Sequence, residues 1–168
     1  KLKLKVNERK TRISKAREST LLGFSFYSDK EGYQIRIAKK SLKRIKEKVK
    51  EITSRRKPHS LEQRLTLLAP IIRGWVNYFK IAKAKSIMQR LDEWTRTRLR
   101  MCAWKQWKLI RTKVNELIRL GVEKIKAIRY GLTRLKYCRI AHSPILQSTL
   151  TNEYFCRQGY VSFMSVYT

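Results

Sequence analysis

Acidic residues that could hold catalytic metal ions are scarce in this sequence. Asp29 and Asp92 are its only aspartates, and no Asp-Asp pair occurs. Transfer of a phosphoryl or nucleotidyl group needs clustered carboxylates to hold its cations. Glu47 with Glu51, and Asp92 with Glu93, are better explained as partners of neighbouring Lys and Arg residues at helical spacing. The sequence therefore predicts no catalytic residue in this chain.

The histidines and cysteines do not form a metal-binding or nucleophilic motif either. His59 and His142 are the only histidines, and neither belongs to a motif that would activate a serine or cysteine. The cysteines, Cys102, Cys138 and Cys156, include no C-x-x-C pair. This argues against a disulfide framework and a zinc site, and it fits a reducing compartment. We expect no metal ion or cofactor in this chain, and binding is the function that remains.

The charge of the chain indicates the class of partner. Its 168 residues include 41 Lys plus Arg against 12 Asp plus Glu, which gives a formal net charge of +29. Such charges repel one another across a compact surface, and nucleic acid is the commonest partner that neutralises them. A basic protein without a polyanionic partner is the alternative. A membrane is not expected, because no segment approaches the roughly 20 apolar residues of a spanning helix.

One stretch combines aromatic and basic residues at helical spacing. Trp75, Tyr78 and Phe79 lie about one turn apart beside Val76, and this pattern favours core packing over stacking on bases. Asp92 and Glu93 are the only acidic residues nearby, and the basic residues from Arg96 onward have no acidic residue among them until Glu116. We therefore expect these basic residues to face solvent and contact phosphates. The residues predicted to contact nucleic acid are Lys43, Arg44, Lys46, Lys50, Arg55, Arg56, Lys57, Arg73, Lys80, Lys83, Lys85, Arg96, Arg98, Arg100, Lys105, Lys108 and Arg111.

The first forty residues have the period-two pattern of antiparallel strands. Basic and apolar residues alternate in "KLKLKVN" at positions 1–7. The apolar residues expected on one face of a strand are Leu22, Phe24 and Phe26 in "TLLGFSFY", and Tyr33, Ile35 and Ile37 in "GYQIRIA". Between these two strands, Asp29 and Gly32 supply the turn chemistry of a hairpin.

Helical periodicity begins near residue 39 and continues to the end of the chain. Ser41 is the expected N-cap of the first helix, and Ser60 with Gln63 has capping-box spacing at the second. We expect a break or kink at Pro70. The expected helices cover residues 41–57, 60–79, a third from Ser86 with Gln89 three residues later, 103–121, 123–135 and 143–159 with Ser143 as its cap. The fold class is predicted to be mainly α, with a small antiparallel β part.

Three strings of residues carry a resemblance to one family. "KLKLKVNERKTRI", followed by "LLGFSF", resembles the end of the palm of a group II intron reverse transcriptase. "PIIRGWVNYFKIAKAKSIMQRLDEWTRTRLRMCAWKQWK" is similar to the maturase-specific domain of that family, and "YCRIAHSPILQSTLTNEYFCRQGY" resembles its C-terminal signature. The resemblance covers essentially the whole chain. It departs from the family around "GLTRLKYCRIAHS", where a Gly-Tyr-Trp string is more usual.

The resemblance implies three parts, which are the end of the palm at 1–38, a helical thumb at 39–85 and a maturase-specific RNA-binding domain at 86–168. Leu22, Gly23 and Phe24 match the hairpin that supports the primer strand. The Tyr-x-Asp-Asp motif of the palm is absent from this chain. We therefore interpret the chain as a piece of a longer RNA-directed DNA polymerase, which would need Mg²⁺ when complete.

The function implied by the resemblance is binding of intron RNA, with assistance to its folding and splicing. In the full-length protein the same helices would grip an RNA/DNA template–primer. The compartment would be the bacterial cytoplasm, in a nucleoid-associated or ribonucleoprotein particle, or an organelle. The alternative is a free-standing basic RNA-binding protein, associated with ribosomes or tRNA and without a polymerase parent. The oligomeric state stays open.

Overall fold

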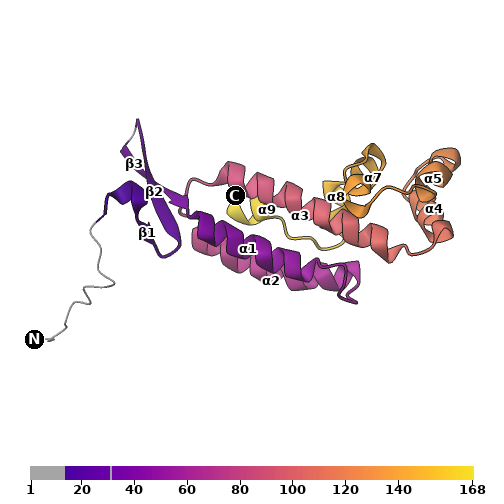
Figure 1. The fold of residues 1–168 in the computed structure, drawn as a ribbon, viewed down its shortest axis with the longest axis horizontal. Coiled ribbons are helices and arrows are strands. Elements are labelled where there is room, and N and C mark those ends of the chain that lie inside the picture. Colours follow the sequence, from indigo (N-terminus) through magenta and orange to yellow (C-terminus); the bar gives the residue numbers. More distant parts are fainter. Residues whose placement is uncertain (1–13, 31) are drawn as a thin grey trace, which may run out of the picture.

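The computed structural model describes residues 14–30 and 32–168. Figure 1 shows an elongated molecule with a small sheet at one end, three long helices along its length and short helices at the other end. This confirms the predicted fold class, which is mainly α with a small antiparallel sheet. The strand predicted over residues 1–7 lies outside the described residues.

The sheet consists of three antiparallel strands in the order β1-β2-β3, preceded by a short 3-10 helix. Within the β2–β3 hairpin, Phe24 pairs with Ile37 and Asp29 pairs with Gly32. The predicted hairpin turn is therefore confirmed. The bounds are Ala16–Glu18 for the 3-10 helix, Thr20–Leu21 for β1, Phe24–Asp29 for β2 and Gly32–Ile37 for β3.

A two-residue turn joins β1 to β2. Its residues, Leu22 and Gly23, both have positive φ, at 51° and 84°, as in the turns that match the twist of hairpin strands. Leu22 is 74% exposed, whereas Phe24 is buried. The expectation that these two side chains share one face of a single strand is wrong, because the chain reverses between them. A Cβ at Gly23 would lie 2.7 Å from the Ser41 Oγ, so the turn is closely packed.

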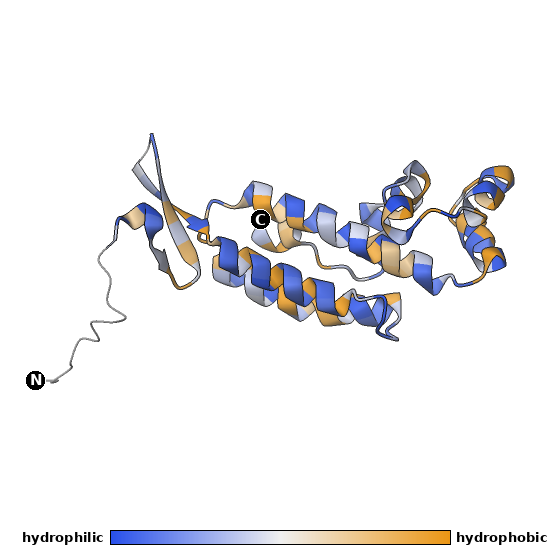
Figure 2. Ribbon diagram, viewed as in Figure 1, coloured by the Kyte–Doolittle hydropathy of each residue, from blue (hydrophilic) through white to orange (hydrophobic). Residues whose placement is uncertain are grey.

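Three long helices form the body of the molecule, namely α1 (Lys39–Ile52), α2 (Leu61–Phe79) and α3 (Lys85–Gln106). Each buries one apolar stripe against the others, and Figure 2 shows hydrophilic residues along the outward side of α1. None of the helices in the described ranges is long and apolar enough to cross a membrane. The buried stripe residues include Ile45 and Val49 of α1, Leu65, Leu68, Ile72 and Val76 of α2, and Met88, Leu91 and Leu99 of α3.

The predicted helix caps are confirmed at Ser60 and Ser143, and the predicted cap at Ser41 is wrong. At α2 the capping box is present, since the Gln63 N–H donates to the Ser60 Oγ at 3.1 Å and the Ser60 N–H donates to the Gln63 Oε1 at 3.0 Å. By contrast, α1 begins at Lys39, and Ser41 is not its N-cap. The Ser41 hydroxyl donates to the Gly23 carbonyl at 3.0 Å instead, which ties α1 to the β1–β2 turn.

Two other predicted helix boundaries are not observed. The helix α2 is continuous through Pro70, and the expected break is absent. Proline removes one helical hydrogen bond, but Leu68 and Ile72 on either side of it are fully buried and hold α2 on the core. Ser86 lies inside the first turn of α3 rather than before it, so Ser86 and Gln89 form no capping box.

Short helices make up the rest of the chain, where two predicted helices are each divided. The helix predicted over 103–121 is interrupted because Trp107 ends α3 and packs against Trp104, with 5.8 Å between ring centroids. The helix predicted over 143–159 stops at Leu150, whose side chain is buried, and Thr151 caps a new helix. The bounds are Ile110–Arg119 for α4, Lys124–Gly131 for α5, Tyr137–Ala141 for α6, Pro144–Thr149 for α7, Asn152–Arg157 for α8 and Phe163–Tyr167 for α9.

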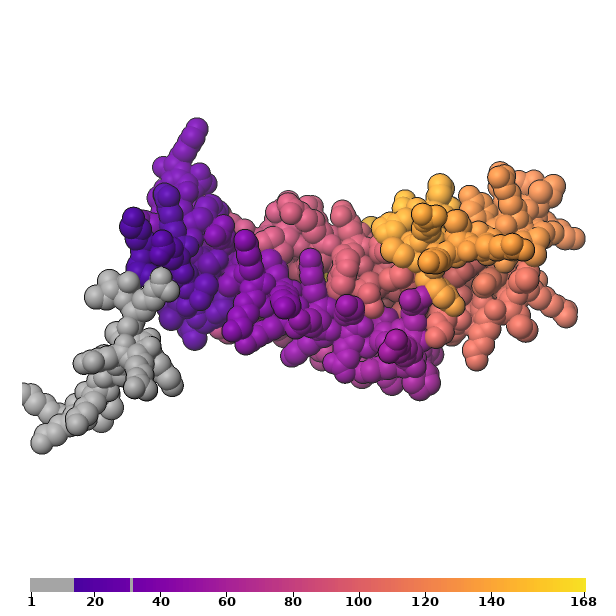
Figure 3. Space-filling view, viewed as in Figure 1, coloured from indigo at the N-terminus to yellow at the C-terminus, as the bar shows by residue number. Residues whose placement is uncertain are grey.

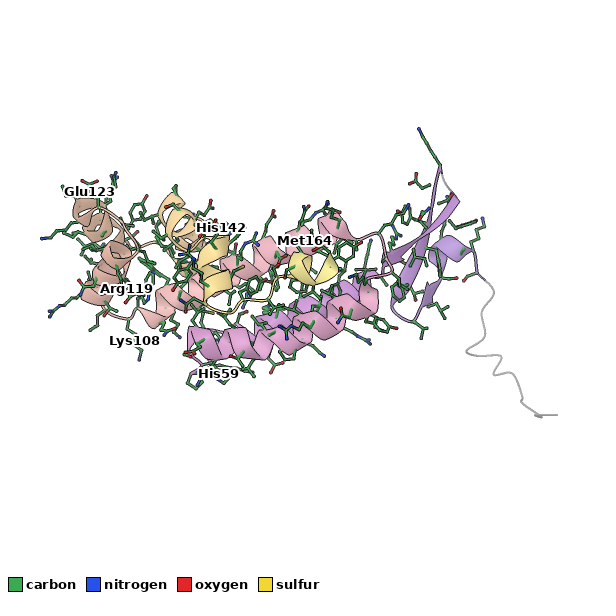
Figure 4. The ribbon with its side chains drawn as sticks, turned by 180° about the vertical axis from the view of Figure 1, so that it is seen from behind. His59, Lys108, Arg119, Glu123, His142 and Met164 are labelled. Carbon is green, nitrogen blue, oxygen red and sulfur yellow. The ribbon has the colours of Figure 1, made fainter. Side chains whose placement is uncertain are left out.

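The C-terminal helix α9 returns to pack on α2 and α3. The Asp92 carboxylate of α3, 2% exposed, accepts hydrogen bonds from the Tyr160 hydroxyl at 2.8 Å and from the N–H groups of Phe163 and Met164, both at 2.9 Å. These two N–H groups begin α9 and have no partner inside that helix. The prediction that Asp92 is a partner of neighbouring Lys or Arg residues is therefore wrong. Its carboxylate instead anchors the C-terminal segment, which Met164 marks in Figure 4.

Candidate nucleic-acid interface

The loop between α1 and α2, residues 53–60, carries three consecutive basic residues, Arg55, Arg56 and Lys57. The first two are exposed, and Lys57 is half-buried. The loop lies at the end of α1 that is remote from the sheet, as Figure 1 shows. It follows a helix C-terminus, where the last carbonyl groups lack partners within the helix and attract cations. The loop therefore needs donors from elsewhere in the chain.

Arg64, in the first turns of α2, supplies most of these donors. Its side chain is only 4% exposed. Its guanidinium donates to the Ser54 carbonyl at 2.9 Å, the Lys57 carbonyl at 2.8 Å and the His59 carbonyl at 3.1 Å, and it also donates to the carbonyl of Ile52. One buried cation thus closes the end of α1 and fixes the loop. This residue was missed among the predicted functional residues, although it lies on the buried stripe of α2.

The helix α3 holds the same loop from the other side. The Arg98 guanidinium donates to the Thr53 Oγ1 at 2.6 Å, the Thr53 carbonyl at 3.2 Å and the Lys50 carbonyl at 3.3 Å. The Cys102 thiol donates to the Thr53 carbonyl at 3.3 Å, and the Lys105 ammonium donates to the carbonyl of Arg55. Burial lowers the pKa of Arg98 and raises the pKa of the Cys102 thiol.

Two adjoining hollows flank the loop. One has a volume of about 440 Å³ and the other about 590 Å³, and both are lined by Arg55, Arg56 and Lys105. Within the described part of the chain, no Asp or Glu lines either hollow. We call the basic residues at their surface the basic cradle, which consists of Lys50, Arg55, Arg56, Lys57, Lys105 and Lys108.

The basic cradle lies where three segments of the chain meet. In Figure 3 the purple surface of residues 39–60 adjoins the C-terminal helices at the end of the molecule opposite the sheet. Figure 4 shows His59 and Lys108 at this end, and both line the smaller hollow. The Arg55 guanidinium lies over the Tyr137 ring of α6, 4.3 Å from its centroid, a contact that favours the cation and restrains its side chain.

Some charges near the cradle are already partly neutralised. Lys57 contacts the Glu51 carboxylate at 2.8 Å, and this hydrogen bond lowers the pKa of Glu51. On the outward face of α1, Lys43 lies 3.9 Å from Glu47. Exposed ion pairs such as these contribute at most about 1 kcal/mol, so both lysines can exchange their carboxylate partner for a phosphate.

The predicted row of solvent-facing arginines on α3 is not what the structure shows. Arg96 is half-buried, Arg98 is bonded to the α1–α2 loop, and the Arg100 Nε donates to the Leu150 carbonyl at 3.0 Å. Burial lowers the pKa of Arg100. The expectation that all three face solvent is wrong, because α3 packs against α1 on one side and the C-terminal helices on the other. Whether they contact RNA stays a prediction.

The aromatic residues at the end of α2 divide between the core and the surface. Phe79 is buried, and Trp75 packs against it with 4.8 Å between ring centroids, which confirms the core prediction for these two. Tyr78 is 51% exposed and is not a core residue. Its hydroxyl donates to the Leu22 carbonyl at 2.9 Å, and its ring stacks on Phe24 at 5.7 Å.

The predicted site residues do not form one patch. The helix α2 spans roughly 28 Å, and the basic cradle lies beside its N-terminus. The hairpin residues Leu22, Gly23 and Phe24 lie at its other end, and their support of a primer strand stays a prediction. The predicted residues outside the cradle that are exposed are Lys43, Arg44 and Lys46 on α1, Arg73 on α2, Lys80 and Lys83 after it, Lys85 at the start of α3, and Arg111 on α4.

Metal ligands are not grouped in the described ranges, where no cluster of three or more His, Cys, Asp or Glu residues could hold an ion. Asp29 ends β2 beside the hairpin turn, and the Asp92 oxygens are occupied by donors of the C-terminal segment. These two aspartates therefore do not fit the Mg²⁺ site of a polymerase, and the chemistry that this arrangement supports is anion binding.

Comparison with protein families gives a match over the middle of the chain. Residues 42–120 match the family described as "Group II intron, maturase-specific domain". No curated protein matches the chain. The matched segment begins in α1, includes the loop and the cradle, and ends just after α4. It also crosses the predicted division between residues 85 and 86, which stays a prediction. The match confirms the resemblance seen in the sequence, and residues 42–120 of this chain are similar to the maturase-specific domain of group II intron maturases.

Proposed function

We propose that this chain binds structured RNA through the basic cradle, and that the RNA is a group II intron whose folding and splicing it assists. The observation that carries the proposal is the arrangement of cations at the α1–α2 loop, which forms two hollows without a lining carboxylate in the described residues. The maturase-specific family match at residues 42–120 supports the choice of RNA.

The mechanism follows from polyelectrolyte physics. Each phosphate that a Lys or Arg neutralises releases a condensed counterion, so affinity depends steeply on salt. The net charge of +29 supplies long-range attraction, while the cradle supplies positioned contacts. Because phosphate contacts fix the register of an RNA without reading its bases, binding is expected to follow the shape of the RNA more than its sequence.

A finer proposal concerns a longer protein. There the exposed basic faces of α1 and α2 would lie along an RNA/DNA template–primer, with Leu22–Phe24 near the primer strand. The packing of Phe24 on Phe79, with 4.9 Å between ring centroids, supports a fixed placement of this hairpin on α2. Mg²⁺ would be held by palm carboxylates outside this chain, since Asp29 and Asp92 do not fit that role.

A salt titration tests the proposal. Filter binding of the chain to a labelled group II intron RNA should give a plot of log affinity against log salt with a negative slope of several units, if ~6–10 phosphates are neutralised. An unrelated structured RNA should show a similar slope. A slope near zero for both RNAs would contradict the proposal.

A further inference from the structure

Most carbonyl groups from the end of α1 through the α1–α2 loop accept hydrogen bonds from side chains of α2 and α3. The main donors are the buried Arg64, the half-buried Arg98 and the exposed Lys105. The carbonyl oxygens that accept these hydrogen bonds belong to Ile52, Thr53, Ser54, Arg55, Lys57 and His59.

This arrangement has an electrostatic consequence at the surface. Carbonyl oxygens carry partial negative charge and would repel a phosphate. With most of these oxygens bonded to the buried Arg64 and the half-buried Arg98, the side chains of Arg55 and Arg56 stay on the outer side of the loop, where both are exposed. The loop therefore presents positive charge to solvent and keeps its negative dipole ends inside.

We infer that the α1–α2 loop is a preorganised binding site for the RNA phosphodiester backbone, in which Arg64, which borders the smaller hollow but is only 4% exposed, acts as a positioning residue. The inference rests on the proposed function and deepens it, because it assigns the phosphate contacts to one loop and the ordering of that loop to the buried side chain of Arg64. A loop that is fixed before binding loses less conformational freedom when the RNA docks. Arg55 and Arg56 are then the residues that contact phosphate.

The chemistry of Arg64 makes the inference testable without a change of charge. Its planar guanidinium has five N–H donors in a fixed fork, and it donates to carbonyls of Ile52, Ser54, Lys57 and His59. A lysine ammonium has only three donors and no fork. Arg64→Lys therefore keeps the net charge but cannot hold the whole loop.

The first experiment compares two charge-matched double variants of the full chain, using a labelled RNA hairpin as the probe. Arg55→Gln with Arg56→Gln should weaken binding at least about tenfold, because it removes two charge-assisted hydrogen-bond donors. The control, Lys39→Gln with Lys40→Gln, removes the same charge from exposed positions at the opposite end of α1. It should weaken binding much less, and its salt slope should stay closer to that of the parent.

The second experiment is a double-mutant cycle between the loop and its support. Arg64→Lys should weaken RNA binding at a temperature where circular dichroism shows the variant to be folded. In that background, Arg55→Gln with Arg56→Gln should have little further effect, because the two arginines are no longer held in place. If Arg64→Lys does not fold, Arg98→Lys serves in the same cycle, since Arg98 holds the loop through Thr53 and Lys50.

The outcomes separate the inference from the proposed function. If the unsubstituted chain binds the RNA hairpin with an affinity that does not depend on salt, the proposed function, which is RNA binding through phosphate contacts, is contradicted. A parent that binds RNA, with equal losses from the Arg55/Arg56 and Lys39/Lys40 pairs, would overturn the assignment of the loop. Additive effects in the cycle would show that Arg64 has only a structural role, and would overturn its assignment as a positioning residue.

Discussion

Asp92→Asn tests how the C-terminal segment is held on α3. The substitution keeps the size of the side chain but replaces one carboxylate oxygen with an NH₂ group. That group must face a donor, which is either the Tyr160 hydroxyl with the Phe163 N–H or the Met164 N–H. A buried donor without an acceptor costs about 1–3 kcal/mol, and the remaining bonds lose the extra strength of a charged acceptor.

We therefore expect Asp92→Asn to lower the free energy of unfolding by about 2–4 kcal/mol, which corresponds to roughly 5–12 °C in melting temperature for a chain of this length. Glu93→Gln is the matched control, because Glu93 is the adjacent residue, is exposed and loses the same charge. It should stay within about 0.5 kcal/mol of the parent. Thermal melts followed by circular dichroism measure both variants. Equal melting temperatures for the two variants would refute the assignment of Asp92 as an anchor.

Three further predictions concern single sites. Gly23→Ala should destabilise the chain by about 1–3 kcal/mol, because an L-residue is strained at φ 84° and its Cβ meets a side chain of α1. Urea unfolding would measure the loss of stability, and an unchanged free energy of unfolding would mean that the turn can relax. Arg100→Gln should lower the melting temperature more than Arg96→Gln, because in the described part of the chain Arg100, unlike Arg96, donates to the Leu150 carbonyl. Equal melting temperatures for the two variants would contradict this. The thiol of Cys102 should react with iodoacetamide more slowly than that of Cys138 at mildly alkaline pH, because burial raises the pKa of Cys102 and leaves less thiolate at a given pH. Peptide mass spectrometry would follow the labelling of both residues. Faster labelling of Cys102 would contradict its burial beneath the α1–α2 loop.

The local pattern of the sequence predicts the long helices α1 and α2 and the β2–β3 hairpin. The capping box at Ser60 and Gln63 is a short-range signal, and its two hydrogen bonds form as predicted. The stripe of Leu65, Leu68 and Ile72 likewise predicts the buried face of α2. Such features depend on residues a few positions apart, so one sequence contains all the information they require.

The roles of charged residues depend on which segments pack together, and the local pattern does not contain that information. Arg98 faces a loop that begins 45 residues before it, and Asp92 binds a segment that begins 68 residues after it. The sequence does contain a weaker signal for the role of Arg64. This residue lies next to Leu65 and belongs to the buried face of α2. A charged residue on an apolar stripe is expected to have internal partners, and this reasoning would have identified Arg64.

The contact between RNA and the α1–α2 loop can be tested most directly by photo-crosslinking. RNA substituted with 4-thiouridine would be bound to the full chain, irradiated and digested, and the crosslinked peptides would be mapped by mass spectrometry. We expect crosslinks in peptides that contain residues 54–57 and residues 137–138, which line the hollows of the basic cradle. Crosslinks confined to the sheet or to α4 and α5, with none at the cradle, would contradict this expectation.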